Sequence, residues 1–328
     1  MTIKEILRKS IKILVAKKID SANIDAEILL LHILNQSKNK PKTFRNDRSW
    51  LCAHNDYKLS KPQENKFHSL IKRREKFEPI AYITCKKEFY GLEFHIDKNV
   101  LIPRPETEII VEESLKEILN DITWRLSLQV EDQPPNTNKK MIIADIGTGS
   151  GAIAITIAKT LKDKKLADQT KIYATDISLK ALKIAKINAK KHKCGKNIIF
   201  KKGDLLKALP KNTKIDFLLA NLPYVGSDYY YYYYYKWLKN GGRPSEFYEI
   251  KHEPKSSLLA KNNGLEYFEK FFPSLPKHIA DKTKIFLESD PFQIPAIKKL
   301  AKKYLPKHKI TVIKDLRGLN RITKIEIK

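Results

Sequence analysis

Cysteine is scarce in this chain, and its spacing excludes two kinds of structure. Only three cysteines occur in 328 residues, and no two of them form a CxxC pair: Cys52, Cys85 and Cys194. Cysteines that are few, odd in number and far apart argue against a disulfide framework and against a zinc site. We therefore expect a reducing compartment and no bound metal.

Long apolar segments are absent as well. No stretch approaches the ~18 uninterrupted apolar residues of a membrane-spanning helix. Residues 1–6 have charges between their apolar side chains, so they lack the apolar centre of a signal peptide. The sequence therefore predicts a soluble, cytoplasmic protein that makes no membrane contact.

Acidic residues are outnumbered by basic ones. The chain has 64 Lys and Arg against 37 Asp and Glu, a formal net charge of +27. Such an excess favours an anionic partner, and weak contact with nucleic acid or the ribosome is one interpretation. The lysines are spread along the whole chain, however, so coding bias alone is a sufficient alternative.

Helical periodicity dominates the first part of the chain. Apolar residues recur at helical spacing within residues 2–15, 21–34 and 62–77, and Thr2 with Glu5 fits a capping box. We predict a helical domain over residues 1–78. Residues 79–105 are predicted to form a β-hairpin and linker, with residues 80–83 and 87–90 flanking the turn.

Strands and helices alternate in the last part. The predicted strands lie at residues 141–145, 171–175, 197–200, 215–220, 284–288, 309–314 and 321–327. This alternation predicts an α/β fold, a doubly wound and mostly parallel sheet with an antiparallel hairpin at one edge. We assign residues 106–328 to this domain, with a helix ending near Leu119 and surface insertions near residues 121–140 and 227–247.

The second insertion contains seven consecutive tyrosines, residues 229–235. No core needs such a run, because successive strand residues point to opposite faces of a sheet. We interpret it as a low-complexity surface loop. The alternative is an aromatic platform that contacts a partner beside the functional site.

A glycine-rich loop follows the first predicted strand of the sheet. Asp145 precedes five loop residues, Gly147, Thr148, Gly149, Ser150 and Gly151. Glycines in such a loop let a ligand approach the backbone closely. The loop lacks the Gly-Lys-Ser/Thr of a P-loop and the GxGxxG spacing of dinucleotide folds, so it is compatible with several other nucleotide binders.

Acidic residues end the next two strands. Asp176 follows the glycine loop at about the sequence spacing expected of an acid that binds ribose hydroxyls. Capping of the following helix is an alternative role. Asp204 can accept a hydrogen bond from an adenine amino group, with Leu205 against the ring. A plain turn is the alternative for that pair.

Asn221-Leu222-Pro223-Tyr224 directly follows the fourth strand. The Asn221 side chain and the Leu222 carbonyl can each accept one N–H bond, Pro223 makes the turn rigid, and Tyr224 offers a flat face. We interpret these four residues as a catalytic receptacle for a planar NH2 group, either an amide or an exocyclic amine.

The ends of consecutive parallel strands line one crevice. A ribose, an adenine and a reactive centre would therefore meet there, which indicates S-adenosylmethionine as the cofactor and methylation of nitrogen as the reaction. Asn221 is predicted to contact the cofactor as well as the acceptor.

These pieces together resemble the peptide-chain release factor glutamine N5-methyltransferase (PrmC/HemK) family over nearly the whole chain. An Asn-Pro-Pro-Tyr type motif alone would also suit a DNA adenine methyltransferase, whereas LIPRPETE at residues 101–108 is far more specific. The other matching segments are residues 73–74, 79–83, 89–92, 145–151, 221–224, 253–254, 263–265 and 314–316, with Gly318 and Arg321.

The resemblance implies a class I S-adenosylmethionine-dependent methyltransferase fold of the Rossmann-like type. It also implies a substrate, the glutamine of the Gly-Gly-Gln loop in class I release factors, and a release-factor-binding role for the helical domain. Asn221 and the Leu222 carbonyl would accept the amide hydrogens, Tyr224 would pack on the amide plane, and no general base would be needed.

The chain departs from the family pattern at Leu222, where proline is usual, and at Cys85, where glycine is usual. Only the carbonyl of residue 222 is needed, and a residue before proline already favours extended backbone. We therefore expect activity to survive. Three alternatives stay open: an adenine N6-methyltransferase acting on DNA or RNA, a ribosomal-protein glutamine methyltransferase, and an inactive RNA-binding or assembly protein.

Overall fold

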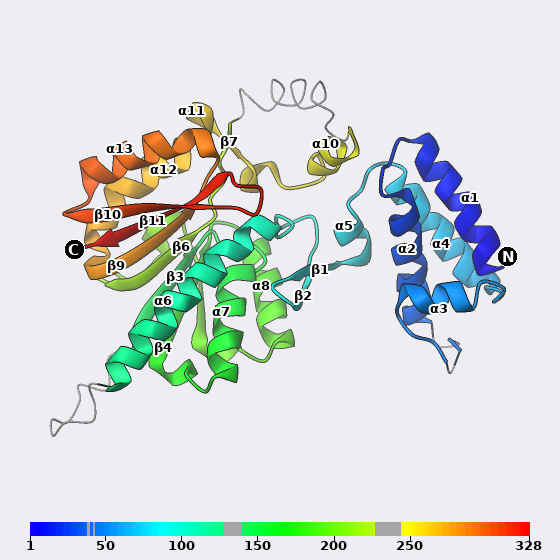
Figure 1. The fold of residues 1–328 in the computed structure, drawn as a ribbon, viewed down its shortest axis with the longest axis horizontal. Coiled ribbons are helices and arrows are strands. Elements are labelled where there is room, and N and C mark those ends of the chain that lie inside the picture. Colours follow the sequence, from blue (N-terminus) through cyan, green and yellow to red (C-terminus); the bar gives the residue numbers. More distant parts are fainter. Residues whose placement is uncertain (38–39, 42, 128–139, 227–243) are drawn as a thin grey trace. The chain divides into compact units, whose positions relative to one another are not determined.

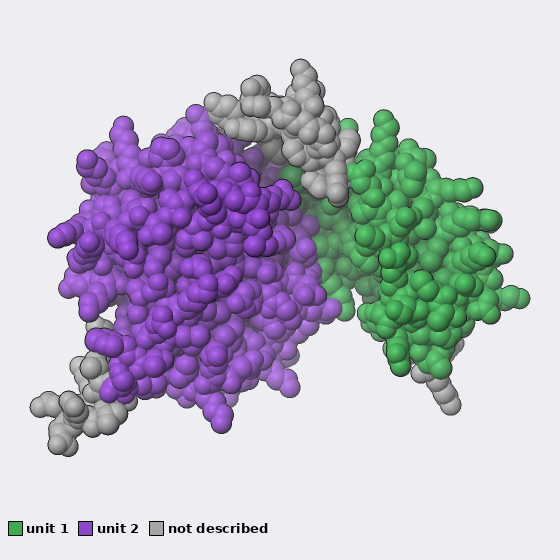
Figure 2. Space-filling view, viewed as in Figure 1, with its two compact units in different colours: residues 1–86, 233–253 green, residues 87–232, 254–328 purple. Residues whose placement is uncertain are grey.

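The computed structural model describes residues 1–37, 40–41, 43–127, 140–226 and 244–328 (Figure 1). The tyrosine run, residues 229–235, lies outside the described residues, as does most of each predicted insertion. The chain divides into two compact units (Figure 2). Unit 1 comprises residues 1–86 and 233–253, and unit 2 comprises residues 87–232 and 254–328. The domain boundaries predicted at residues 78 and 105 stay predictions.

Unit 1 is helical, as its apolar periodicity predicts. Its helices are α1 (Ile3–Ala16), α2 (Ala22–Gln36), α3 (Arg48–Ala53), α4 (Lys61–Arg74), α5 (Ile80–Thr84) and α10 (Pro244–Ile250). The capping box of Thr2 and Glu5 at the start of α1 is confirmed. Residues 80–83, expected beside a hairpin turn, form the short helix α5 instead, with Pro79 as its N-cap residue and with Tyr82, Ile83 and Thr84 buried.

Cys85 ends α5 with a φ of 56°, in the left-handed region that favours glycine. The glycine that the resemblance leads us to expect at this position would adopt this backbone angle without strain. The hairpin itself comes next, with strands β1 (Lys86–Phe89) and β2 (Leu92–His95). Its turn residues Tyr90 and Gly91 both have positive φ, 52° and 71°, as a tight two-residue hairpin turn requires.

A buried ion cluster joins α10 to the other helices of unit 1. Arg74 is 1% exposed, and its guanidinium donates to Asp25 Oδ2 and to Glu249 Oε1, each at 2.6 Å. Beside it the rings of Phe77 and Tyr248 lie with centroids 4.7 Å apart. Residues 244–250 are thus held by contacts with residues more than half the chain away.

Unit 2 contains the predicted sheet. Among the described residues, seven strands form this sheet in the order β10-β11-β9-β6-β3-β4-β5. The strands are β3 (Met141–Ile146), β4 (Thr170–Asp176), β5 (Ile198–Lys202), β6 (Ile215–Ala220), β9 (Ile279–Glu288), β10 (His308–Lys314) and β11 (Asn320–Ile327). The pairs from β9 to β5 are parallel, and β11 pairs antiparallel with β9 and β10. The doubly wound sheet with an antiparallel hairpin at one edge is confirmed.

Helices cover both faces of this sheet (Figure 1). On one face lie α6 (Glu108–Ser127), α7 (Ala152–Asp163) and α8 (Leu179–Lys191). On the other lie α12 (Glu266–Phe271) and α13 (Ile294–Tyr304). A minor pair of strands, β7 (Val225–Gly226) and β8 (Leu259–Ala260), leads into α11 (Lys261–Gly264). Helix α6 runs past the end predicted at Leu119, because Ile122 continues its buried stripe.

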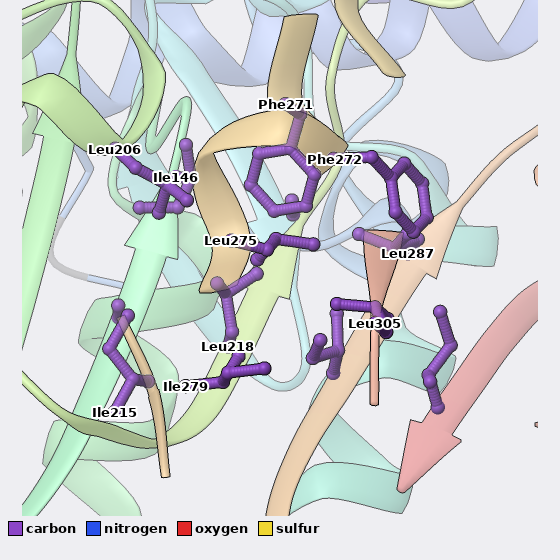
Figure 3. Packing of buried hydrophobic residues seen from close by; sticks show 14 of the residues in the cluster. Ile146, Leu206, Ile215, Leu218, Phe271, Phe272, Leu275, Ile279, Leu287 and Leu305 are labelled. Carbon is purple, nitrogen blue, oxygen red and sulfur yellow. The ribbon is translucent and has the colours of Figure 1, made fainter. Parts of the chain in front are cut away.

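Alternate residues of the strands point into one apolar core. Leu218 of β6 and Leu287 of β9 pack with Phe271, Phe272 and Leu275 beneath the sheet (Figure 3). This packing fixes the carboxyl ends of the strands against one another. Within the described residues, no helix is both long and apolar enough to span a membrane.

We expect Arg74→Met to lower the free energy of unfolding by about 3–5 kcal/mol, because Asp25 would be left buried without its cation. Arg73→Met is the matched control. The Arg73 side chain is 43% exposed and pairs with Glu78, so its loss should cost about 1 kcal/mol or less. Chemical denaturation measures both variants, and equal losses would contradict the importance of the buried cluster.

Candidate active site

A pocket of about 220 Å³ opens at the carboxyl ends of the parallel strands of unit 2. Ten of the predicted site residues line it: Gly147, Thr148, Gly149, Ser150, Asp176, Asp204, Leu205, Asn221, Leu222 and Pro223. Gly151 and Tyr224 are not in its lining. The structure therefore brings together one site from four separate strand ends, and the roles of these residues stay predictions.

The glycine loop is folded back onto the end of β4. The N–H groups of Gly147 and Thr148 both donate to the Thr175 carbonyl, at 2.9 and 2.8 Å. Gly147 has a φ of +76°, and a Cβ there would lie 3.3 Å from Leu222 Cδ2. Among the described residues, a Cβ on Gly149 would meet nothing closer than the Gly147 carbonyl oxygen, at 4.0 Å, so the backbone is open at that residue. Gly151 serves packing, since a Cβ on it would lie 2.5 Å from Ile155 Cδ1 of α7.

Asp145 anchors this loop from below. Its Oδ2 accepts from Thr148 Oγ1 at 2.6 Å and from the Ala154 N–H at 3.2 Å. Its Oδ1 is buried and has no hydrogen-bond partner among the described residues. Burial raises the pKa of this carboxyl from 3.8 to about 7.

Asp176 ends β4 with both carboxylate oxygens aimed at backbone donors. Oδ2 accepts from the Gly149 N–H at 2.9 Å and Oδ1 from the Ser178 N–H at 2.8 Å. The cap of α8 is Ser178, whose hydroxyl accepts from Ala181, so capping does not account for Asp176. Each of its oxygens keeps capacity for a further donor, while burial raises its pKa.

The adenine pair predicted from the sequence also lies at the pocket. Leu205 has a φ of 49°, and it begins the short 3-10 helix η5 (Leu205–Ala208). Asp204 lies 3.7 Å from Lys207 Nζ in an exposed ion pair. The apolar side chain of Ile177, next to Asp176, is 64% exposed and lines the same pocket.

Sequence reasoning missed Ile177 and Tyr267 as lining residues, although an apolar residue directly after a strand-end acid is a usable signal. It also treated LIPRPETE as a family marker rather than as part of the site. Four residues of that segment line the pocket: Leu101, Pro103, Arg104 and Thr107. Thr107 ends the 3-10 helix η1 (Pro105–Thr107).

Asn221 is held by residues 103–107, called the PRPET segment below. Its Nδ2 donates to Thr107 Oγ1 at 2.9 Å, and Thr107 Oγ1 donates to Glu288 Oε2 at 2.7 Å. The Tyr224 hydroxyl donates to Glu288 Oε1 at 3.0 Å. Glu288 ends β9 and is 1% exposed, and burial raises its pKa. Burial and the nearby Glu288 charge raise the pKa of Tyr224 well above its usual value.

Two acceptors of the motif are left without partners. Among the described residues, no group donates to Asn221 Oδ1 or to the Leu222 carbonyl oxygen. The Leu222 side chain is 3% exposed and packs in the core beneath the sheet. Within the described part of the chain, the motif therefore leaves the Asn221 Oδ1 and Leu222 carbonyl acceptors free at the pocket, while the Leu222 side chain packs in the core.

Two family models match this chain. A model of the PrmC N-terminal domain matches residues 5–84, and a model of a methyltransferase domain matches residues 137–315. A release factor glutamine methyltransferase of Rhodopirellula baltica is 31% identical over 307 residues, covering 94% of this chain and 90% of the relative.

The chain belongs to the release factor glutamine methyltransferase family. A family member from Dictyoglomus turgidum is 32% identical over 93% of this chain and 92% of its own length. One from Coxiella burnetii is 33% identical over 91% of this chain and 90% of its own length. The resemblance inferred from the motifs is confirmed, and so is the methyltransferase fold of unit 2.

Asp145 makes the stability of this family member depend on pH. A carboxyl whose pKa is raised on folding stabilises the folded state fully below its unfolded pKa and loses that contribution as pH rises through its folded pKa. We therefore expect the free energy of unfolding to fall between about pH 4 and about pH 7. Asp145→Asn should flatten this slope in denaturation curves recorded across the pH range. An unchanged slope would contradict the assignment.

Proposed function

We propose that the protein transfers a methyl group from S-adenosylmethionine to the side-chain amide nitrogen of the glutamine in the Gly-Gly-Gln loop of class I release factors. The observation that carries this proposal is the pair of unpartnered acceptors, Asn221 Oδ1 and the Leu222 carbonyl, beside the pocket. Such a pair fits a group with two N–H donors. The names of the family members supply the substrate class.

The pocket residues fit the cofactor. Asp176 would accept from the ribose hydroxyls, and the open backbone of the glycine loop would lie along the amino-acid portion. Asp204 would accept from the adenine amino group, between the apolar side chains of Ile177 and Leu205. When bound, S-adenosylmethionine supplies a methyl group on a sulfonium, and the sulfur keeps the bonding electron pair when that methyl group leaves.

Positioning is the main task of the protein groups. An amide nitrogen is a poor nucleophile because its lone pair is delocalised into its carbonyl. Asn221 and the Leu222 carbonyl would hold both hydrogens and so aim the nitrogen at the methyl carbon, an effect that can contribute up to about 7–11 kcal/mol. On transfer the amide nitrogen would gain the methyl group in place of the sulfur and would give one proton to water.

This chemistry needs no ionisable general base, because a methylated and protonated amide is strongly acidic. The Tyr224 hydroxyl is already committed to Glu288 at 3.0 Å. Its ring would pack against the plane of the glutamine amide. The apolar side chain of Leu222 faces the core, which supports activity with leucine in place of the usual proline.

A transfer assay separates this function from its alternatives. The protein is incubated with methyl-labelled S-adenosylmethionine and, separately, with a class I release factor, the same factor with its Gly-Gly-Gln glutamine replaced, ribosomal proteins, RNA and duplex DNA. We expect label only in the intact factor. Label in the substituted factor, or in DNA, RNA or ribosomal protein alone, would overturn the proposal.

In that assay Asn221→Ala should lower kcat by about 10²-fold or more, because one acceptor that positions the nitrogen is lost. The dissociation constant for S-adenosylmethionine, measured by calorimetry, should change little. Asn197→Ala is the matched control. Asn197 directly precedes β5, donates to the Ala167 carbonyl and does not line the pocket. Full activity of Asn221→Ala would contradict the receptacle role.

We also propose that the helical domain, residues 1–78, helps to bind the release factor. Deleting residues 1–77 is expected to weaken factor binding more than cofactor binding, and titration of the truncated protein with each ligand measures both. Unchanged affinity for the factor would refute this role. Contact with nucleic acid or the ribosome stays a prediction from the charge of +27.

A further inference from the structure

The proposed role of Asn221 depends on which way its side-chain amide is turned. One end of that amide carries an acceptor oxygen and the other carries two N–H donors. Only the oxygen can hold an N–H of the substrate. A 180° rotation of the amide would exchange Oδ1 and Nδ2, and the Asn221 NH2 group would then face the N–H groups of the substrate. Some neighbouring group has to select the productive orientation.

Thr107 supplies an acceptor on one side of that amide. Its hydroxyl has a single hydrogen, which it donates to the buried Glu288 carboxylate, with Oγ1 and Oε2 2.7 Å apart. An ionised carboxylate can only accept, so this bond runs from Thr107 to Glu288 as long as Glu288 is charged. Thr107 Oγ1 is left with lone pairs alone, and it meets the NH2 group of Asn221 at 2.9 Å.

Glu288 is tied to the motif a second time. Its other oxygen, Oε1, accepts from the Tyr224 hydroxyl at 3.0 Å. The two hydroxyls satisfy a carboxylate that burial would otherwise penalise, and each is held in one direction as a result. Glu288 thus sets the donor-to-acceptor direction of the hydrogen bonds that link it to Thr107, Asn221 and Tyr224.

The backbone beyond the motif is fixed from the same segment. Gln293 follows Glu288 closely, is 1% exposed, and donates from Nε2 to the Tyr224 carbonyl at 2.8 Å and to the Asn263 carbonyl at 2.9 Å. Gly264 abuts this point, since a Cβ there would lie 2.0 Å from the Tyr224 carbonyl oxygen. The motif therefore has little room to turn as a unit.

We propose that Thr107 and Glu288 are positioning residues that lock the Asn221 amide with its oxygen toward the acceptor substrate. The proposal rests on the proposed function and deepens it. The lock makes the site selective for groups that donate hydrogen bonds, such as a primary amide. Neither residue contacts the reacting atoms, and both act through Asn221.

Substitutions at Thr107 distinguish this role from simple packing. Valine keeps the shape of threonine and removes the hydroxyl, whereas serine keeps the hydroxyl and removes a methyl group. We expect Thr107→Val to lower kcat about tenfold, the size expected for one lost hydrogen bond, with KM changed less. Thr107→Ser should recover kcat to within about threefold of the unaltered protein. A packing role would give the reverse order.

Glu288→Gln provides a second and independent variant. One side of a glutamine amide donates, so it can release the Thr107 hydrogen toward Asn221 and permit the wrong orientation. We expect kcat to fall in this variant, and the further loss to be much smaller when Thr107→Val is already present, because both changes break one chain of bonds. Full additivity would overturn the proposal.

Binding of S-adenosylmethionine by each variant, measured by calorimetry, shows that the fold and the cofactor pocket are intact. Full kcat in Thr107→Val, or a Thr107→Ser variant as impaired as Thr107→Val, would also overturn the positioning role while leaving the proposed function standing. Failure of the unaltered protein to label the release factor would overturn the proposed function itself.

Discussion

The buried carboxylate of Glu288 is the constraint on which the site depends. A charged group at 1% exposure is costly unless hydrogen bonds compensate it. Two hydroxyls do so, and they come from segments far apart in the chain, Thr107 in the PRPET segment and Tyr224 in the strand-end motif. One acid at the end of β9 therefore brings two motifs together and gives their hydrogen bonds a fixed direction.

The sheet explains why such an acid can stand there. Polar residues lie at or next to the ends of four of its parallel strands: Asp145 one residue before the end of β3, Asp176 at the end of β4, Asn221 directly after β6 and Glu288 at the end of β9. The residues just before these ends are mainly apolar and buried, so the strand ends are the places where polar groups can be bonded by loops. Core packing sets the positions of these polar residues, and hydrogen-bond donors in the loops orient their side chains.

The sequence was sufficient for the strands, the glycine loop and Asn221-Leu222-Pro223-Tyr224, because period and composition carry that information locally. It did not reveal Glu288 or Gln293, whose importance comes from partners on other strand ends. It made residues 80–83 part of a hairpin, although tertiary packing of Tyr82 and Ile83 favours a helix. It also missed the attachment of residues 244–250 to α4, which depends on the ion pair of Arg74 with Glu249.

Leu222 shows how the two kinds of information combine. Its side chain is buried in the core beneath the sheet, and its Cδ2 lies where a Cβ on Gly147 would meet it at 3.3 Å. In the proposed function only its backbone carbonyl contacts the substrate. The second position of the motif is therefore limited by volume and by extended backbone, which Pro223 enforces from the next position, and leucine meets both limits. Asn221 has less freedom, because its Nδ2 donates to Thr107, while the proposed function requires an acceptor at Oδ1, and a primary amide is a short side chain that carries both.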